Sequence, residues 1–283
     1  MILRACTDFI VPTYETKFFK TGRKPEKVTP YLTNRVHQSM CRRLGHVPKY
    51  EGAIVLEPRR NFYRDTTLCL DFASLYPSIA RAFNLSHDTL HDEAVVVECT
   101  EVDEGWLRVH VTPCHETPNG YFFVDTSVRE GIIPRVVREL LAQRKQVKRA
   151  MKGADAVQKP LLNARQLALK TCANSVYGYT AMRNAKVTCI AVASSITAHG
   201  RQMITETRDH IEKTYPETVV VYGDTDSVFV KTKRPLQEAL AFGRHLEEEL
   251  NRIGLYKAPN YLEFEKAYRP YLLLGKKKYA GFK

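Results

Sequence analysis

Hydrophobic and polar positions along the chain follow two periods, one typical of strands and one typical of helices. In residues 127–152, apolar side chains recur at helical spacing between a start at SVREG and a stop at Gly153. VVVYGDTDSVFV (219–230) has two β-rich arms around a polar turn and predicts a hairpin. The other expected elements are strands at 53–56 and 66–71, a turn and short helix in 72–83, an antiparallel excursion in 92–125, helices at 158–182, 191–215 and roughly 236–254, and a strand-like stretch at 261–281.

Strands at both ends of this order, with helices between them, predict an α+β fold and argue against a doubly wound one. Residues 1–50 are polar and basic, with Pro25, Pro30 and Pro48 as breakers, so we expect a connector there. No apolar run approaches the ~20 residues of a membrane span. The opening MILRACTDFI is too short for a secretory signal, so we expect an intracellular protein with no membrane partner.

The charge balance indicates a polyanionic partner. Among 283 residues, 43 Lys and Arg stand against 31 Asp and Glu, which gives a formal charge of +12 and a pI near 9.3. The alternative is that many soluble proteins are mildly basic. Seven scattered cysteines, none of them in a CxxC pair, argue against a disulfide framework and against a zinc ribbon.

The acids of the predicted hairpin are candidate metal ligands. Asp224 and Asp226 sit in its turn, one residue apart, and apolar arms hold them on a sheet. Oxygen ligands on a stiff support suit a hard cation, although Gly and Asp are also ordinary turn residues. Asp71 ends the apolar run TLCLD, where an unpaired carboxylate would cost several kcal/mol and a metal would offset that cost. The alternative for Asp71 is a helix N-cap.

Two of the predicted helices carry candidate phosphate ligands. Arg144 and Lys148 lie one turn apart on one face, which suits a triphosphate, although a charge run is usually a solvated face. On the next helix, Lys170, Asn174 and Tyr177 line one stripe that can meet phosphate, sugar and base, or can be surface decoration. Four apolar residues are expected to pack elsewhere on that helix: Leu162, Leu167, Leu169 and Val176.

At this point several segments match a known family. DFASLYPSI (71–79), KTCANSVYG (170–178) and YGDTDSV (222–228) resemble the three polymerase motifs of family B DNA polymerases, in the family's order. KKKYAG (276–281), LLAQRKQVK (140–148) and LEFEKAY (262–268) resemble further segments of the same family. Within it, DFASLYPSI and KKKY lean toward the polymerases of herpesviruses and other large DNA viruses, and ARQLALKTCANSVYGYT and EKAYRPYLLLGKKKYAG lean toward the delta-type replicative enzymes.

The resemblance implies a polymerase palm, an antiparallel sheet with packed helices, and fingers made of a long helical hairpin. It assigns residues 1–50 to a connector after a missing exonuclease domain, 51–126 to the first part of the palm with a small antiparallel insertion, 127–182 to the fingers, and 183–283 to the second part of the palm. The thumb and the exonuclease are absent from this sequence. We therefore expect a fragment of a longer polymerase, and the missing thumb argues against independent activity.

The resemblance also implies the metal site. Asp71 and Asp226 match the two metal-binding aspartates, and the backbone carbonyl of Phe72 matches a third ligand. Asp224 matches an acid with a lesser role in coordination, and Glu265 matches an acid near the metals. Two Mg²⁺ ions are implied, for which Mn²⁺ can substitute.

The other implied roles concern nucleotide and DNA. Ser74 and Leu75 match backbone N–H donors to the triphosphate, and Tyr76 matches the ring that excludes a 2′-hydroxyl. Lys170 matches part of the triphosphate clamp and is the candidate to protonate or neutralise the leaving group. The remaining matches are Arg144 and Lys148 in the clamp, Asn174, Tyr177 and Gly178 facing the nascent base pair, and Lys276, Lys277, Lys278 and Tyr279 contacting the primer–template.

The implied activity is template-directed addition of deoxynucleotides from dNTPs to a primer 3′-hydroxyl, in DNA replication. The implied partners are primer–template DNA, dNTPs and a processivity factor bound by a missing C-terminal region, and the implied location is the nucleus, or the host nucleus for a viral enzyme. A non-catalytic nucleic-acid-binding module is the alternative from another class, and intact acids at all three positions speak against it. A metal-dependent nuclease would leave the basic helices unexplained.

Overall fold

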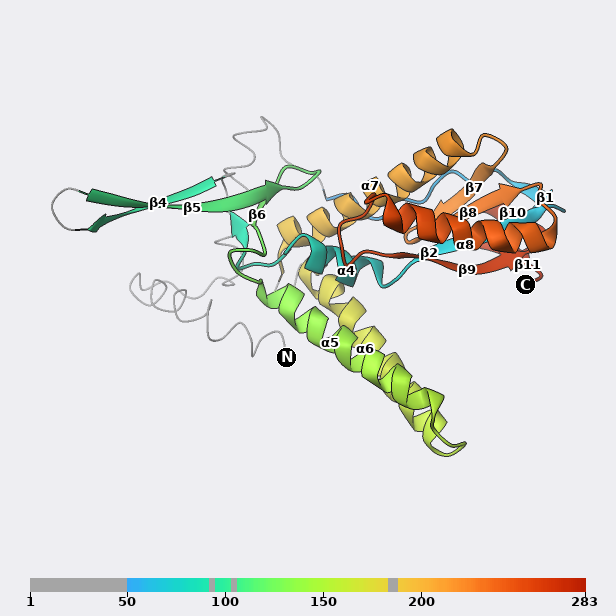
Figure 1. Ribbon diagram of the computed structural model, residues 1–283, viewed down its shortest axis with the longest axis horizontal. Coiled ribbons are helices and arrows are strands. Elements are labelled where there is room, and N and C mark those ends of the chain that lie inside the picture. Colours follow the sequence, from blue (N-terminus) through green and yellow to red (C-terminus); the bar gives the residue numbers. More distant parts are fainter. Residues whose placement is uncertain (1–49, 92–94, 103–105, 183–187) are drawn as a thin grey trace. The chain divides into compact units, whose positions relative to one another are not determined.

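The computed structural model describes residues 50–91, 95–102, 106–182 and 188–283 (Figure 1). The expected connector at 1–50 therefore lies outside the described residues, apart from Tyr50. The chain divides into two compact units. We call Glu51–Ala82 with Thr197–Lys283 the sheet unit, and Phe83–Ile196 the helix unit.

The sheet unit is built on a four-stranded antiparallel sheet in the order β7-β8-β2-β9. The predicted hairpin is confirmed as its first two strands. The central strand β2 is buried on both faces, which explains why its sequence reads as a nearly continuous apolar run. The four strands are β2 (Thr66–Phe72), β7 (Val219–Asp224), β8 (Ser227–Thr232) and β9 (Leu262–Tyr268).

Helix α8 (Leu236–Arg252) packs on one face of this sheet, against β2 and β9. The approach is close at Gly243, where an added Cβ would lie 2.7 Å from the ring of Phe264 on β9. Leu70 on β2 pairs directly with Phe264, so it faces the same way. Side chains alternate along a strand, and Cys69 and Asp71 therefore belong to the opposite face.

A second, three-stranded sheet in the order β1-β10-β11 completes the sheet unit. The stretch predicted as one strand-like run at 261–281 is thus three strands, because Pro270 and the lysine-rich turn interrupt it. Aromatic residues of both sheets share one core cluster, which includes Tyr222, Phe229 and Tyr271. The strands are β1 (Asn61–Tyr63), β10 (Tyr271–Gly275) and β11 (Lys278–Gly281).

The strand predicted at 53–56 is wrong as a full strand, since only Val55 forms an isolated bridge, to Asp224. The segment still runs along the edge of β7, with Leu56 N–H donating to the Gly223 carbonyl at 2.8 Å. Gly223 permits this approach, because an added Cβ would lie 2.8 Å from the Leu56 side chain. The short helix predicted in 72–83 is confirmed as α4 (Leu75–Ala82).

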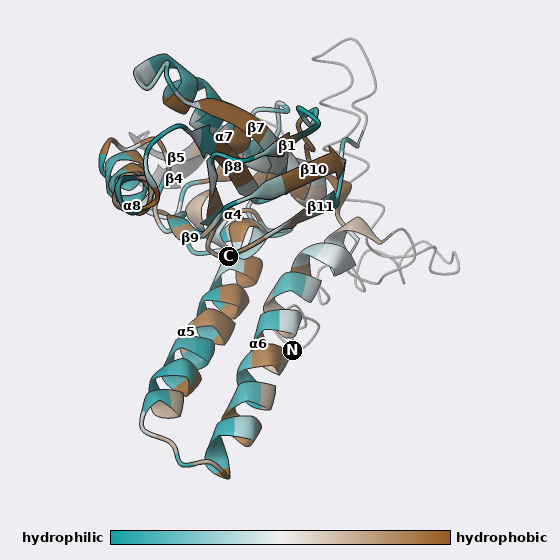
Figure 2. Cartoon of the chain, turned by 90° about the vertical axis from the view of Figure 1, so that its right-hand side faces the viewer, coloured by the Kyte–Doolittle hydropathy of each residue, from teal (hydrophilic) through white to brown (hydrophobic). Residues whose placement is uncertain are grey.

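The helix unit contains the predicted antiparallel excursion, a sheet in the order β3-β6-β5-β4. Its strands are β3 (Leu90–His91), β4 (Val95–Val102), β5 (Trp106–Glu116) and β6 (Phe122–Val124). Two long helices, α5 (Ile132–Lys152) and α6 (Gln158–Ala181), follow as a hairpin and share an apolar cluster near the start of α5. Figure 2 shows the first turns of α5 as hydrophobic and its later turns as mainly hydrophilic.

The predicted start of α5 at residue 127 is wrong by about a turn, because side chains distant in the sequence cap it. Asn84 Oδ1 accepts the Gly131 N–H at 2.8 Å, and Ser86 Oγ accepts the Ile133 N–H at 3.2 Å. Asp88 Oδ1 likewise accepts the Ile132 N–H. These bonds satisfy amides that a helix leaves without internal partners, and they fix its first residue.

The expected packing of α6 also needs a correction. Leu167 is 49% exposed, so it does not pack as predicted. Gln166 is buried instead, and it accepts a hydrogen bond from Arg144 Nε at 3.3 Å. Leu169 and Val176 do pack as predicted, and Ala173 joins them on the buried side.

Helix α7 (Ile190–Thr214) contributes to both units, and its C-terminal part contacts α8 through one carboxylate. Glu249 accepts hydrogen bonds from Tyr215 and His210, the latter with 3.1 Å between Nε2 and Oε1. His245 lies 3.4 Å from the same carboxylate. Burial alone would raise the pKa of Glu249, but the bonds from Tyr215 and His210 outweigh it and lower the pKa.

Glu249→Gln is therefore expected to lower the free energy of unfolding by about 1–3 kcal/mol at pH 7, since it weakens charged hydrogen bonds. A carboxylate with a lowered folded-state pKa stabilises above its ordinary value of 4.5 and loses that contribution as the pH falls through the folded pKa. The difference between the native protein and the variant should accordingly shrink below pH 4.5. Urea unfolding at several pH values measures it, with the exposed neighbour Glu248→Gln as control. A difference that is constant with pH would contradict the prediction.

Every helix in the described ranges is too short or too polar to span a membrane.

Candidate active site

The register of the four-stranded sheet brings the three predicted aspartates to one end of it. Asp224 ends β7, Asp226 stands in the two-residue turn, and Ser227 begins β8 opposite Asp224. On the other side of β8, Ser227 pairs with Asp71 of β2. The Phe72 N–H donates to the Asp226 carbonyl at 2.8 Å, which ties the turn to the end of β2. Since neighbouring strands lie about 4.8 Å apart, Asp71 and Asp224 flank Ser227 at about 10 Å across the sheet.

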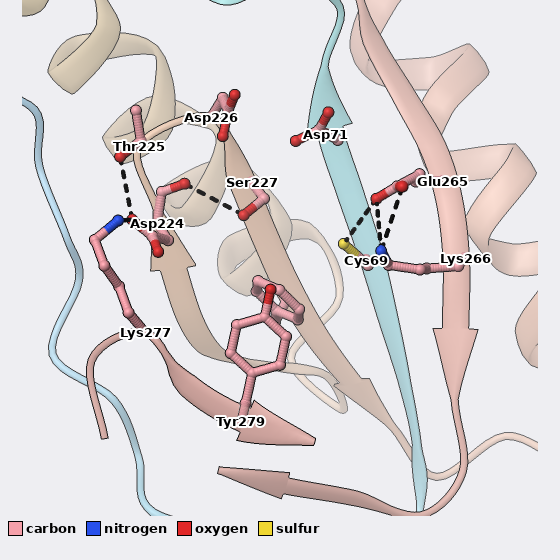
Figure 3. Close-up of a pocket in the computed structure, with 11 residues that line it drawn as sticks. Cys69, Asp71, Asp224, Thr225, Asp226, Ser227, Glu265, Lys266, Lys277 and Tyr279 are labelled. Atoms are coloured by element: carbon pink, nitrogen blue, oxygen red, sulfur yellow. Dashed lines mark hydrogen bonds and ion pairs between the residues drawn. The ribbon is translucent and has the colours of Figure 1, made fainter. Parts of the chain in front are cut away.

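These residues line an open pocket of about 360 Å³ on the sheet face opposite α8 (Figure 3). Cys69 and Asp71 reach it together because they are two residues apart on β2. The figure shows Asp71 and Asp226 at the same end of the pocket, above Ser227. The lining residues are Cys69, Asp71, Asp224, Thr225, Asp226, Ser227, Phe229, Glu265, Lys266, Lys277 and Tyr279.

A β-bulge brings Glu265 into the pocket. Leu70 pairs with Phe264 and Cys69 pairs with Lys266, so Glu265 is an extra residue on β9. In a regular strand Glu265 and Lys266 would point to opposite faces, but both line the pocket here. Their charged groups form an ion pair at 3.2 Å.

The Cys69 thiol lies beneath this pair and donates a hydrogen bond to Glu265 Oε2 at 3.7 Å. Burial first, and the nearby Glu265 carboxylate second, raise the pKa of Cys69 to about 12. The thiol therefore stays protonated at neutral pH and is not prepared to act as a thiolate ligand or nucleophile.

Asp224 is held by three donors from the protein. Lys277 Nζ contacts Oδ1 at 2.7 Å, Thr225 Oγ1 donates to the same oxygen at 3.1 Å, and Tyr222 OH donates to Oδ2 at 3.2 Å. The hydrogen bond to Asp224 is the main reason that the pKa of Lys277 is raised. The ammonium accordingly remains charged throughout the physiological range.

The other lysine-motif residues have different surroundings. Lys276 forms an ion pair with Glu57 at 2.6 Å between two exposed side chains. Lys278 is exposed. The Tyr279 ring packs among the rings of Tyr222, Phe229 and Tyr271, with centroid distances of 5.1–6.1 Å.

The motif DFASLYPSI forms a tight turn between β2 and α4. Ser74 takes a left-handed φ of 51°, and its carbonyl accepts the Ser78 N–H at 3.0 Å. Leu75 is buried and Tyr76 is half-buried in the first turn of the helix. The Tyr76 ring lies beside Gly200 of α7, where an added Cβ would be 3.6 Å away in ordinary contact.

The predicted nucleotide-binding residues of α5 and α6 belong to the helix unit, whereas the acids belong to the sheet unit. Lys148, Lys170 and Asn174 are exposed, and Arg144 is half-buried against Gln166. The half-buried Tyr177 shares a hydrogen bond of 2.6 Å with the hydroxyl of Tyr50, and Gly178 is half-buried as well.

Sequence reasoning missed several residues of the pocket. Cys69 could have been found from the strand period, since it precedes Asp71 by two residues. Lys266 could not, because the bulge that turns it inward leaves no local signal in the sequence. Thr225 stands in the hairpin motif itself, as does Tyr222, which does not line the pocket. The bonds of both to Asp224 depend on the turn geometry.

The donor chemistry of the pocket fits Mg²⁺. Carboxylate and carbonyl oxygens are hard ligands, and the acids come from three strands of one rigid sheet. Among the residues that the structure describes, no group of three or more His, Cys, Asp or Glu side chains could hold a metal ion by itself. Mg²⁺ is usually held by one or two carboxylates, with water and substrate phosphates completing its shell.

Comparison with known proteins agrees with the motifs. The family model described as DNA polymerase family B matches residues 1–283. The chain belongs to DNA polymerase family B. Among its family B relatives, the DNA polymerase delta catalytic subunit of Schizosaccharomyces pombe is 44% identical over 243 residues, which is 82% of this chain and 22% of the relative.

Two further relatives carry the same name. The protein from Candida albicans is 42% identical over 247 residues, covering 84% of this chain and 23% of the relative. The protein from Plasmodium falciparum is 44% identical over 243 residues, covering 82% of this chain and 21% of the relative. The chain thus spans about a fifth of the length of these relatives. All three are delta-type, one of the two branches that the motifs suggested, and the viral branch is not confirmed.

Proposed function

We propose that this family B chain is the catalytic core for template-directed DNA synthesis, in which deoxynucleotides from dNTPs are added to a primer 3′-hydroxyl. The observation that carries the proposal is the meeting of Asp71, Asp224 and Asp226 at one end of a single pocket. Relatives named as DNA polymerase delta catalytic subunits support it. By the same reasoning we propose DNA replication in the nucleus, with primer–template DNA and a processivity factor as partners.

Asp71 and Asp226, with the Phe72 carbonyl, are the proposed ligands of two divalent ions, and Glu265 is a proposed acid near them. When bound, the ions would lower the pKa of the primer 3′-hydroxyl and offset charge on the leaving pyrophosphate. The chain's own residues then have to position the triphosphate, because phosphoryl transfer needs little covalent help from the protein. Backbone N–H groups of Ser74 and Leu75 are the proposed donors to it.

Arg144, Lys148 and Lys170 are proposed to neutralise the triphosphate, with Lys170 placing a proton on the leaving group. Their exposure on α5 and α6 leaves Lys148 and Lys170 accessible to a ligand.

Asn174, Tyr177 and Gly178 are proposed to face the nascent base pair. Lys276, Lys278 and Tyr279 are proposed to contact the primer–template, which the net charge of +12 favours in a salt-dependent way.

In domain terms we propose the palm for residues 51–126 and 183–283, the fingers for 127–182, and a connector at 1–50. The long hairpin of α5 and α6 supports the fingers, and the four-stranded sheet with α8 supports the palm. The compact units divide at Phe83 and Thr197, so the small antiparallel sheet groups with the long helices.

Tyr76→Val is expected to reduce discrimination against ribonucleotides by at least about tenfold, because a smaller side chain leaves room for a 2′-hydroxyl. Primer extension with dNTPs and rNTPs in parallel measures the ratio of kcat/KM values. Tyr179→Val is the control, since Tyr179 is an exposed tyrosine of α6 outside the proposed site. Unchanged sugar selectivity in Tyr76→Val would remove Tyr76 from this role.

Metal-dependent dNTP binding distinguishes the proposed polymerase from the alternative, a non-catalytic nucleic-acid-binding module. A binding module should bind DNA and be indifferent to both Mg²⁺ and dNTP. Template-dependent extension by the whole protein, lost on removal of divalent ions with EDTA, supports the polymerase. DNA binding without metal-dependent dNTP binding or extension would reject it.

A further inference from the structure

We propose that Lys277 is a positioning residue that holds Asp224 out of the set of metal-binding carboxylates. The inference rests on the proposed function, and it departs from the motif resemblance, which assigns Lys277 to DNA. In this reading Lys277 acts on the metal site through Asp224 and sets the negative charge that the ions experience.

Both carboxylate oxygens of Asp224 already have donors within the protein. Oδ1 accepts from Lys277 Nζ and Thr225 Oγ1, and Oδ2 accepts from Tyr222 OH. The Asp224 side chain is only 16% exposed, so its charge needs partners inside the protein. With both oxygens engaged, Asp224 has a compensated charge before any divalent ion arrives.

The main chain of Lys277 fixes the position from which its side chain reaches Asp224. It stands in the turn between β10 and β11 with a left-handed φ of 61°, and its own N–H donates to Tyr222 OH at 2.8 Å. Tyr222 is fully buried. One tyrosine hydroxyl therefore links the Lys277 main chain to the carboxylate that the Lys277 side chain contacts. The turn of one sheet is thereby locked onto the hairpin of the other, and the ammonium is delivered to Asp224.

The Lys277 side chain is 66% exposed, so its ion pair should contribute little to folding stability. Its effect on a neighbouring cation site is different, because the charge of Asp224 counts in full once the ammonium is removed. A unit charge several Å from a divalent ion at the edge of a protein changes its affinity by on the order of tenfold.

The test measures Mn²⁺ binding to the whole protein in the absence of DNA and nucleotide. The electron paramagnetic resonance signal of free Mn²⁺ reports how much of the ion remains unbound. Lys277→Met is expected to bind Mn²⁺ about three- to tenfold more tightly than the native protein, because it releases the charge of Asp224. Lys278→Met is the matched control: it removes the same charge from the next position, which is exposed. Its affinity should change by less than about twofold.

A double-mutant cycle makes the inference specific to Asp224. Asp224→Asn alone leaves the Lys277 ammonium without its counter-charge and should weaken Mn²⁺ binding by about three- to tenfold, whereas the double variant should bind Mn²⁺ within about twofold of the native protein. Equal effects of Lys277→Met and Lys278→Met overturn the inference, as does a double variant that binds about tenfold more weakly than the native protein, since Asp224 would then be a metal ligand. Circular dichroism checks folding, and if Lys277→Met does not fold, Lys277→Gln takes its place.

The same assay separates this inference from the proposed function. Asp71→Asn and Asp226→Asn should each lose Mn²⁺ affinity if they are the ligands, and their failure to do so overturns the proposed metal site. Absence of Mn²⁺ binding by the native protein overturns both. If Asp71→Asn and Asp226→Asn lose Mn²⁺ affinity but Lys277→Met and Lys278→Met bind Mn²⁺ equally well, only the role of Lys277 is overturned.

Discussion

Asp71→Asn and Asp226→Asn are each expected to lower the rate of primer extension by at least about a thousandfold, with DNA binding largely intact. Each change keeps the size of the side chain and removes one of the two carboxylates proposed to hold the ions. DNA binding should survive, because removing a negative charge does not weaken attraction to a polyanion. Single-turnover extension at saturating Mg²⁺ measures the rate, and a mobility-shift assay measures DNA binding.

Asp65→Asn is the matched control for this pair. Asp65 lies just before β2 and pairs with Lys231 at 3.0 Å, away from the pocket. Its side chain is 43% exposed, so neither folding nor extension should change appreciably. Extension at the native rate by either pocket variant would reject the assignment of Asp71 and Asp226. A fall in all three variants would point to a general loss of folding.

Lys170→Ala is expected to lower kcat for nucleotide addition by about 10²–10³, with a rise in KM for dNTP. The side chain is proposed to neutralise the triphosphate and to give a proton to the leaving pyrophosphate. The two contributions can be separated with Lys170→Arg, which keeps the charge but cannot give up its proton at working pH. Lys170→Arg should recover much of the dNTP affinity and little of kcat.

Lys159→Ala provides the control on the same helix, since Lys159 is exposed near the start of α6. Pre-steady-state incorporation of one nucleotide, measured over a range of dNTP concentrations, gives kcat free of DNA release. Saturating dNTP should not restore the native rate in Lys170→Ala. A native kcat in Lys170→Ala, with only KM altered, would show that Lys170 binds the triphosphate without transferring a proton.

Secondary structure was largely readable from residue patterns. The hairpin at 219–230, the strand at 66–71 and the long helices follow periods that are local properties of the chain, and the structure places them within a few residues of the expected bounds. The three aspartates could also be named, because each stands where an apolar strand ends. A carboxylate at such a place is held by a rigid support, and that is visible without coordinates.

Other features depend on contacts between residues far apart in the chain. Helix α5 begins at Ile132 because Asn84, Ser86 and Asp88 cap its first amides, and no pattern within 127–152 contains that information. Leu167 was expected to pack and is exposed, because the direction of the partner helix decides which stripe is buried.

The residues of the pocket likewise fall into those that the sequence pattern indicates and those that only tertiary contacts bring there. The amino-acid pattern alone determined that the chain has strand-borne acids and basic helices suited to phosphate. Only the tertiary structure decided that a bulge on β9 turns both Glu265 and Lys266 inward, and that Lys277 reaches Asp224 from a different sheet. The physical reason is that period and composition are set by neighbours in sequence, whereas register, bulges and ion pairs are set by which strands meet in space.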